Sequence, residues 1–199
     1  MIIFSALGLA VLGYLSGSLP FSVWITRLFR GVDLRDSGSG HATTTNTIRQ
    51  AGFIPGALVL ILDISKGFFP TWLALKYAPV SWIIPLTAAA IVIGHCWPVF
   101  AQFRGGMGLA CAGGSLLAAS LPSFFILIAV LILLTLTIRH PARASVVTGI
   151  AGAPVLWLLG FRGIEIWITV AVGIVIAGRF LIDWNRQYHG RWLEREKHS

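Results

Sequence analysis

The sequence predicts an all-α, polytopic membrane protein that forms one domain over residues 1–199, and two features of its composition carry that prediction. The chain is 56% hydrophobic and only 11% charged, whereas soluble domains carry about 25% charged residues. Its apolar runs also approach the roughly 20 residues that a helix needs to cross a bilayer. A third observation, the placement of the basic residues, predicts which side of the membrane each loop faces.

Seven apolar segments in the sequence lead us to expect about seven transmembrane helices. They cover residues 2–24, 53–76, 81–101, 106–119, 122–138, 144–160 and 164–182. Pro20 can kink the end of the first segment, where neighbouring hydroxyls can satisfy the freed carbonyls. The fourth segment is short and rich in Gly and Ala, so it can be re-entrant where protein or a cavity satisfies its backbone. Five or six full spans with broken pieces is the alternative.

Basic residues divide unevenly between the two sides that seven spans would create. One side holds only Lys76 and Arg162, while Lys66 lies within a span. The other side holds the remaining twelve, which are Arg27, Arg30, Arg35, Arg49, Arg104, Arg139, Arg143, Arg179, Arg186, Arg191, Arg195 and Lys197. Because cytoplasmic loops carry the excess of Lys and Arg, we expect the N-terminus outside and the C-terminus in the cytoplasm. We therefore attribute the net charge of +8 to membrane topology and to contact with anionic membrane lipid, and not to binding of nucleic acid.

The cysteines and the two ends of the chain indicate which further features this membrane protein has. Cys96 and Cys111 lie in or beside apolar segments without the spacing of a disulfide framework or metal site. The sequence also has no metal constellation and no Walker pattern, so we expect no metal and no cofactor. The first charged residue is Arg27, so the first segment lacks the basic start of a cleaved signal peptide and we expect it to be retained. The C-terminal tail mixes Trp184 and Trp192 with basic residues, which is typical of an interfacial segment on anionic lipid.

The longest polar stretch before the tail covers residues 27–49, with four arginines, two aspartates, a Ser-Gly-Ser-Gly run and a Thr-Thr-Thr-Asn run. Its glycines allow the chain to curl around an anion, to which Ser37, Ser39 and nearby N–H groups can donate. Arg35 and Arg49 can add charge-assisted bonds to phosphate. The stretch therefore favours a site for an anionic substrate at the membrane surface. The alternative is a flexible loop whose arginines only set topology.

A second polar feature lies inside an apolar segment. Asp63 and Lys66 have the spacing that places both on one face of a helix. Charges within a span are costly and normally face a partner or a cavity. Two interpretations stay open: the two residues form an ion pair that holds the bundle, or one of them reaches the site in residues 27–49.

The stretch 94–114 combines His95 with a turn, Arg-Gly-Gly-Met-Gly over 104–108, at the start of the fourth segment. Bare N–H groups and the helix dipole make such a turn an anion site, although glycines in membrane helices also serve packing. A phosphate loop usually carries a lysine, and this turn has none. His95 is either a hydrogen-bonded residue between helices or part of the site, and Ser145 can add a hydroxyl from the sixth segment.

Three groups of residues occur together and in one order. The first group is GYLSGSLPFS at 13–22, followed by Arg27, Gly31, Asp33, Arg35, the run 37–40, Thr45, Asn46 and Arg49. The second group is Asp63 with Lys66-Gly67. The third group is Gly94-His95, Pro98-Val99-Phe100, Phe103, Gly105-Gly106 and Gly108. In this combination they resemble the bacterial membrane family of acyl-phosphate:glycerol-3-phosphate acyltransferases, the PlsY type. The likeness covers at least residues 13–114.

The resemblance implies a monomeric seven-helix enzyme of the bacterial inner membrane. Acyl phosphate and sn-glycerol-3-phosphate would meet at the cytoplasmic face, where the sn-1 hydroxyl attacks the acyl carbonyl, inorganic phosphate leaves, and lysophosphatidic acid forms for phospholipid synthesis. By this resemblance Ser37 and Arg49 correspond to the family's essential serine and arginine. The residues that we expect to bind substrate are Arg35, Ser39, Gly40, Thr45, Asn46, Lys66, His95, Gly105, Gly106, Gly108 and Ser145.

Several positions depart from the family pattern. The family's Gly-Gly-Lys-Gly-Val-Ala-Thr reads Gly-Gly-Met-Gly-Leu-Ala-Cys, so Met107 replaces a lysine. Its Gly-Asn-x-Gly-Ala-Thr-Asn reads Gly-His-Ala-Thr-Thr-Thr-Asn, so His41 replaces an asparagine and Thr43 a glycine. The late His-x-x-Asn motif has no match, and the best alignment puts Phe180 and Asp183 there.

These departures produce one further expectation and two alternative functions. We expect His41 to supply, as a cation or a base, what Met107 and Phe180 do not, which places it among the catalytic residues. The first alternative is a non-catalytic relative that binds a lipid phosphate or a partner enzyme. The second is a small transporter, for which buried charges are few and paired repeats are missing.

Overall fold

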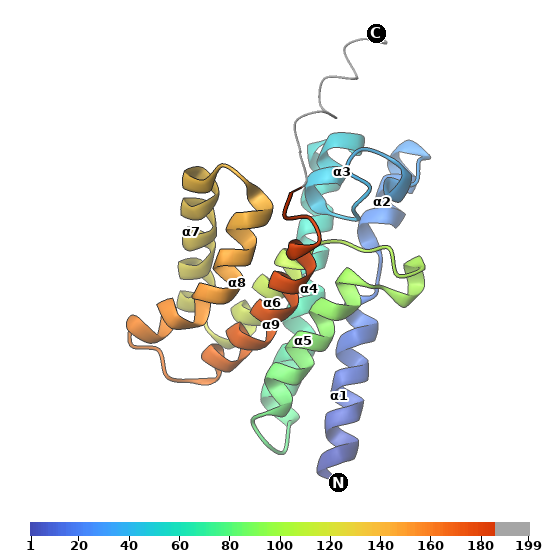
Figure 1. The fold of residues 1–199 in the computed structure, drawn as a ribbon. Coiled ribbons are helices and arrows are strands. Elements are labelled where there is room, and N and C mark those ends of the chain that lie inside the picture. The colour runs from blue at the N-terminus through green and yellow to red at the C-terminus, as the bar shows by residue number, and fades with distance from the viewer. Residues whose placement is uncertain (186–199) are drawn as a thin grey trace.

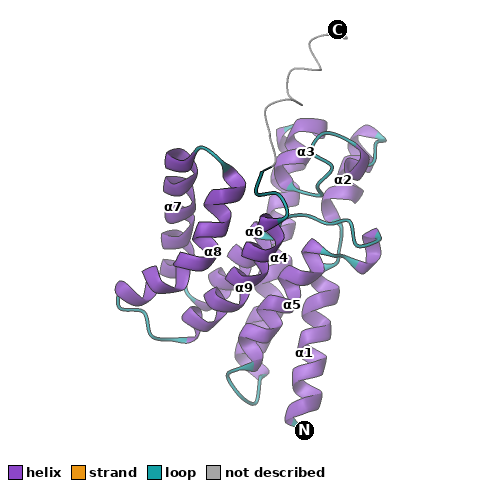
Figure 2. Ribbon diagram, viewed as in Figure 1, coloured by secondary structure: helices purple, strands orange, loops and turns teal. Residues whose placement is uncertain are grey.

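The computed structural model describes residues 1–185, and every regular element in that range is helical (Figures 1 and 2). The α-helices are α1 (Ile2–Gly17), α2 (Phe21–Arg30), α3 (Thr44–Ala51), α4 (Phe53–Tyr77), α5 (Ile83–Cys96), α6 (Leu109–Ala119), α7 (Leu121–Ile138), α8 (Pro141–Leu158) and α9 (Ile164–Leu181). Two short 3-10 helices, Leu34–Asp36 and Val99–Ala101, lie in the longer loops. The all-α prediction is confirmed, and most of the predicted interfacial tail lies outside the described residues.

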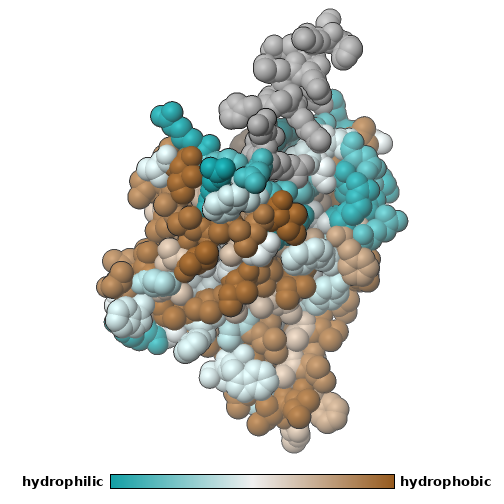
Figure 3. Space-filling model, in the orientation of Figure 1, coloured by the Kyte–Doolittle hydropathy of each residue, from teal (hydrophilic) through white to brown (hydrophobic). Residues whose placement is uncertain are grey.

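The outer surface of the bundle is that of a membrane protein. Five stretches are long and apolar enough to cross a membrane, namely Ile2–Arg30, Phe53–Tyr77, Ile83–Ala101, Leu121–Ile138 and Ile164–Leu181. Only 11% of the α7 window is buried, and Ile132, Leu133 and Leu136 are exposed on the outer surface, as expected of a helix that faces lipid. Figure 3 shows hydrophilic side chains gathered at the end that holds α2 and α3, above a mostly hydrophobic body. The count of about seven spans stays a prediction, because α6 and α8 fall outside this set.

The predicted segment 2–24 is broken in the structure. α1 ends at Gly17 and α2 begins at Phe21, because Pro20 has no N–H to donate and its ring clashes with a continuing helix. The break exposes the Leu19 carbonyl, which accepts a hydrogen bond from Lys66 Nζ at 2.8 Å. What the sequence predicted as a kink is therefore a change of direction that places a polar acceptor beside a buried lysine.

Four helices approach one another closely beneath this break. A Cβ added to Gly17 of α1 would collide with the Ile91 carbonyl of α5, and one added to Gly67 of α4 would collide with the Cys111 carbonyl of α6. Such contacts between helix backbones are typical of membrane bundles, where small residues mark the interfaces. The close packing joins the end of α1 to α5 and the middle of α4 to the start of α6, and Figure 1 shows α1 ending inside the molecule, with α2 and α3 beyond it.

Candidate active site

The loop between α2 and α3 is held by a network around Arg35. Arg35 donates from Nε to Asp33 Oδ1 at 2.9 Å and from Nη2 to Asp33 Oδ2 at 2.7 Å, while Arg27 donates to the same Oδ2 at 3.0 Å. Hydrogen bonds from Arg35 hold the pKa of the Asp33 carboxyl well below its usual range. Nη1 of Arg35 reaches the Ala101 carbonyl at 3.0 Å. Each side-chain nitrogen of this predicted phosphate ligand thus has a protein acceptor, and Arg35 clamps the loop to the 3-10 helix Val99–Ala101.

Asn46 organises the rest of the loop from within. Its side chain is fully buried, and Nδ2 contacts the carbonyls of Leu34, Ser37 and His41 at 3.0–3.3 Å, while Oδ1 accepts from Ser39 N at 3.2 Å. One amide therefore fixes the path of the Ser-Gly-Ser-Gly run. Asn46 thus shapes the loop that carries other predicted site residues, and its own contact with substrate stays a prediction.

The loop residues predicted to meet substrate occupy the rim of this scaffold. Ser37, Ser39 and Gly40 are partly buried, with Gly38 and Gly40 at positive φ of 59° and 72°. Such angles strain any residue with a side chain and turn the run back on itself. Arg49 lies in the last turn of α3 and is partly buried. Thr45 is exposed near the start of α3.

A small polar pocket lies at the α1–α2 break, with an empty volume of about 190 Å³. It is lined by Gly17, Leu19, Pro20, Ser22, Ala42, Lys66, His95, Pro98, Gly105 and Gly106. Four predicted site residues, Lys66, His95, Gly105 and Gly106, thus meet in one place, below the loop that carries Ser37. Lys66 Nζ lies 3.0 Å from Asp63 Oδ1, so the predicted ion pair and the predicted contact with the site are both present.

The glycine turn forms one wall of the pocket. Gly106 N donates to the His95 carbonyl at 3.0 Å, and Ala42 N donates to the Gly105 carbonyl at 3.3 Å. A Cβ on Gly106 would collide with the His95 imidazole and the Ala42 carbonyl, so only glycine fits there. Gly108 has φ +83° and caps α6, which is why the fourth segment becomes helical at Leu109 and not at the predicted residue 106.

Met107 and Ser145 lie away from the polar pocket. The Met107 side chain is 8% exposed and packs in the apolar core, so it contributes nothing polar to the turn. Ser145 is buried and donates to the Pro141 carbonyl at 2.9 Å. Ser145 lines a different space, an apolar groove with an empty volume of about 530 Å³ that runs between α6, α7, α8 and α9. The structure therefore separates Ser145 from the other predicted substrate-binding residues.

Two contacts that the sequence did not predict join the end of α9 to the site. His41 Nε2 lies 2.7 Å from Asp183 Oδ2, with the two side chains 14% and 9% exposed, and the pair becomes an ion pair when the imidazole is protonated. Arg179 Nε donates to the Gly106 carbonyl at 3.1 Å. The sequence marked His41 and Asp183 as departures, but nothing in it marked them as partners.

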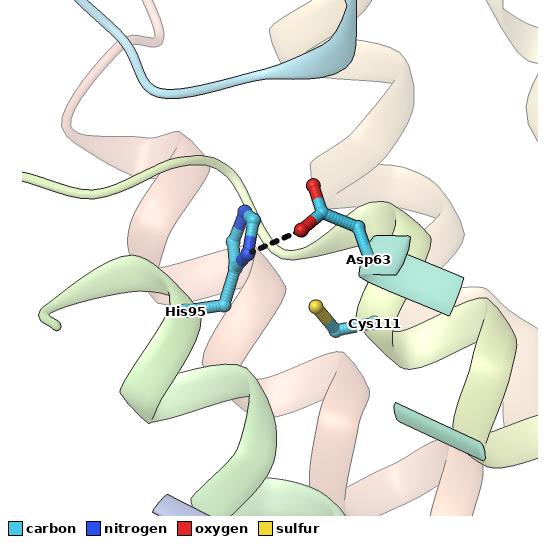
Figure 4. Close-up of side chains that lie close together, drawn as sticks. All are labelled: Asp63, His95 and Cys111. Atoms are coloured by element: carbon cyan, nitrogen blue, oxygen red, sulfur yellow. Dashed lines mark ion pairs between the residues drawn. The ribbon is translucent and has the colours of Figure 1, made fainter. Parts of the chain in front are cut away.

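Figure 4 shows a buried group of possible metal ligands beside the pocket, made of Asp63, His95 and Cys111. Their ligand atoms lie within 4.8 Å of one another, and His95 Nδ1 lies 3.9 Å from Asp63 Oδ1. The same carboxylate oxygen already contacts the Lys66 ammonium at 3.0 Å. A divalent cation would have to share that oxygen with a positive charge, so the group fits a lysine-neutralised carboxylate better than a metal centre.

Known proteins share the sequence pattern of this chain. The model of a family described as glycerol-3-phosphate acyltransferase matches residues 7–190. The chain belongs to this family. A glycerol-3-phosphate acyltransferase from Aquifex aeolicus is 36% identical over 94% of this chain and 97% of its own length, and glycerol-3-phosphate acyltransferase 2 from Thermotoga maritima is 36% identical over 75% and 76%.

Solved structures of PlsY (YgiH), an integral membrane glycerol 3-phosphate acyltransferase, share the fold. The glycerol 3-phosphate form superposes with a TM-score of 0.80 at 36% identity, covering 94% of both chains. The lysophosphatidic acid form gives 0.79 at 35% identity, covering 94% of this chain and 93% of its own. These relatives favour the acyltransferase hypothesis over the non-catalytic alternative. Membership of this family also agrees with the predicted integral membrane class.

Proposed function

We propose that the chain is a glycerol-3-phosphate acyltransferase that transfers a fatty acyl group from acyl phosphate to the sn-1 hydroxyl of glycerol-3-phosphate, giving lysophosphatidic acid for phospholipid synthesis. The observation that carries the proposal is the polar pocket that gathers Lys66, His95, Gly105 and Gly106 in a member of this family. A phosphorylated substrate needs cations and hydrogen-bond donors, and this pocket places the Lys66 ammonium beside a glycine turn.

The reaction itself requires little covalent help from the protein. The hydroxyl oxygen forms a bond to the acyl carbon, the bond from that carbon to the bridging phosphate oxygen breaks, and inorganic phosphate leaves with the electron pair. The hydroxyl proton leaves with the phosphate, directly or through His41. Because the donor is already activated, catalysis rests on orientation and on donors aimed at the developing oxyanion. In this scheme Ser37 donates to that oxyanion or to phosphate, and Arg49 holds phosphate charge.

The apolar groove supports a fatty acyl donor. Its lining begins at Leu109, directly after the glycine turn, and continues between α6 and α9 past Ala112, Val172 and Ile176. An alkyl chain in this groove would keep its phosphate end near the turn and its methyl end among lipid-facing helices. Ser145 then contributes to the wall of the acyl groove and not to phosphate binding.

The membrane arrangement belongs to the same proposal. About seven spans, with the N-terminus outside and the C-terminus in the cytoplasm of a bacterial inner membrane, put the pocket on the cytoplasmic side. The basic residues at that end would also attract anionic lipid. The protein would act as a monomer in one domain, without cofactor or metal, as the family resemblance implies.

The test is direct acyl transfer by the purified full chain in nanodiscs. Acyl phosphate and labelled glycerol-3-phosphate should give labelled lysophosphatidic acid and one equivalent of inorganic phosphate. Ser37→Ala and Arg49→Gln should each reduce the rate by at least about 100-fold, whereas Ser65→Ala, at a partly exposed α4 serine that bonds only its own helix, should not. Absence of product with glycerol-3-phosphate and with every other polyol phosphate would contradict the proposed activity.

A further inference from the structure

The polar pocket has too little positive charge of its own for a phosphate. Lys66 is the one charged side chain among the pocket-lining residues that the structure describes, and Asp63 already neutralises it at 3.0 Å. Two arginines close to the loop are likewise committed: Arg35 pairs with Asp33 at 2.7 Å, and Arg104 pairs with Asp36 at 2.8 Å. A dianionic phosphate in this pocket requires a further cation within reach.

Arg179 on α9 lies where such a further cation is needed, beside the pocket. Its Nε donates to the Gly106 carbonyl, on the wall of the pocket, and its guanidinium lies 5.8 Å from the centre of the Trp97 ring. Arg179 therefore brings a second cation, from α9, to the wall of a pocket whose own cation, Lys66, lies on α4.

The Arg179 guanidinium is held in place by the protein but keeps hydrogen-bonding capacity for a ligand. Over residues 1–185, Nε makes the one hydrogen bond of the Arg179 side chain, and Arg179 has no carboxylate within 4.0 Å. Arg179 is partly buried, so both terminal nitrogens stay available to a ligand while the Gly106 and Trp97 contacts fix the plane. A pre-oriented guanidinium with two unused N–H-bearing nitrogens is suited to bidentate binding of phosphate.

We propose that Arg179 is a phosphate-binding residue of this enzyme, which supplies from α9 the positive charge that the turn at 105–108 lacks. The inference rests on the proposed function, since the ligand is the phosphate group of a substrate. That phosphate belongs either to glycerol-3-phosphate or to acyl phosphate, and kinetics with each substrate varied in turn separates the two.

The experiment compares three variants of the full chain in nanodiscs. Arg179→Gln removes the charge, Arg179→Lys keeps the charge without the planar fork, and Arg162→Gln is the matched control. Arg162 also stacks on a tryptophan, with 4.5 Å between its guanidinium and the Trp157 ring centre, and donates to backbone carbonyls. It lies in the α8–α9 loop, at the other end of α9. KM and kcat are measured for each substrate in turn.

Arg179→Gln should raise the KM of one of the two phosphate substrates by about 10- to 100-fold, since it removes charge-assisted bonds. The substrate whose KM rises is the one that Arg179 holds. Arg179→Lys should recover part of that loss, and Arg162→Gln should stay within about twofold of the parent. Unchanged KM values for both substrates in Arg179→Gln would overturn the inference while leaving the proposed function intact.

A binding measurement tests whether Arg179 binds phosphate, independently of turnover. Inorganic phosphate should raise the Tm of the parent protein and of Arg162→Gln, and this shift should be lost in Arg179→Gln. If the parent makes no lysophosphatidic acid, the proposed function fails, and an equal phosphate shift in the parent and Arg179→Gln would overturn the role of Arg179 as well. Should Arg179→Gln fail to fold, Arg179→Lys decides: an unchanged KM and an unchanged phosphate shift would argue against bidentate binding.

Discussion

The loop between α2 and α3 and the glycine turn at 105–108 meet at one pocket but are held in opposite ways. The loop is shaped from within, because Asn46 bonds to carbonyls five to twelve positions away in the chain. The turn is shaped from outside, because its partners are His95 on α5, Ala42 in the loop and Arg179 on α9. The loop thus depends mainly on contacts between nearby residues, with Arg35 also donating to the Ala101 carbonyl. The turn forms only once the helices have packed.

Because they are held differently, the loop and the glycine turn should be sensitive to different substitutions. A local network fails when its central residue is lost, since several acceptors lose their donor together. An assembled wall fails when the distance between its helices changes, since no single bond defines it. Substitutions that remove a hydrogen bond and substitutions that add volume should therefore separate the two regions.

The largest effect is expected for Asn46→Ala. The substitution leaves the carbonyls of Leu34, Ser37 and His41 without this donor in a buried place, and each such loss costs about 1–3 kcal/mol. The displaced loop should lower kcat/KM by at least about 100-fold. Thr44→Ala, on the same helix turn, should change it by less than about twofold. Comparable losses in both variants, measured by lysophosphatidic acid formation, would show that Asn46 does not organise the loop.

Gly106→Ala tests the assembled wall. Its added methyl would collide with the His95 imidazole and the Ala42 carbonyl, so the turn and the loop must separate, and we expect a loss in kcat/KM of about 10- to 100-fold. The matched control is Gly8→Ala on α1, where a Cβ meets open space and alanine stabilises a helix by about 0.5–1 kcal/mol. If Gly106→Ala keeps full activity and Tm, the wall tolerates movement and the contrast between the two regions fails.

The sequence predicted what is local or periodic. Apolar runs predicted the membrane helices, and the i, i+3 spacing of Asp63 and Lys66 predicted the ion pair that the structure contains at 3.0 Å. The glycines at 38 and 40 predicted a curled loop, and both have positive φ. These features depend on neighbours in the chain, so that residue type and spacing are enough to indicate them.

What the sequence could not indicate are contacts between distant segments. His41 and Asp183 are 142 positions apart, and Gly106 and Arg179 are 73 apart. No spacing rule connects such pairs, because their distance is set by how α5, α6 and α9 pack. For the same reason the sequence did not indicate that Ser145, which we expect to bind substrate, lines the apolar groove. The roles of the individual site residues stay predictions until variants are measured.

A double-mutant cycle tests the contact between His41 and Asp183, which links the loop to the end of α9. We expect His41→Asn and Asp183→Asn to be coupled by about 1–2 kcal/mol in kcat/KM, because the contact at 2.7 Å is well shielded. The double variant should then be no worse than the poorer single variant. Purely additive losses would mean that the two residues act separately, and an unchanged rate in His41→Asn would end its predicted role as cation or base.

The smallest effect concerns pH and the loop alone. Because Arg35 lowers the pKa of Asp33 in the folded state, the carboxylate contributes stability above the ordinary carboxyl pKa, near pH 4, and this contribution is lost as the pH falls below that value toward the folded-state pKa. The Tm of the parent should therefore fall more steeply below about pH 4 than that of Asp33→Asn.

Asp36→Asn is the matched control for this measurement. Its carboxyl also meets an arginine, at 2.8 Å from Arg104, but 67% of the side chain is exposed, and exposed pairs contribute little. The acid dependence of its Tm should follow the parent. If Asp33→Asn follows the parent too, the Arg35 clamp does not determine the stability of the loop. The integrity of the local region would then depend on Asn46, which does not titrate, and the loop should keep its shape in acid until the packed helices around the glycine turn give way.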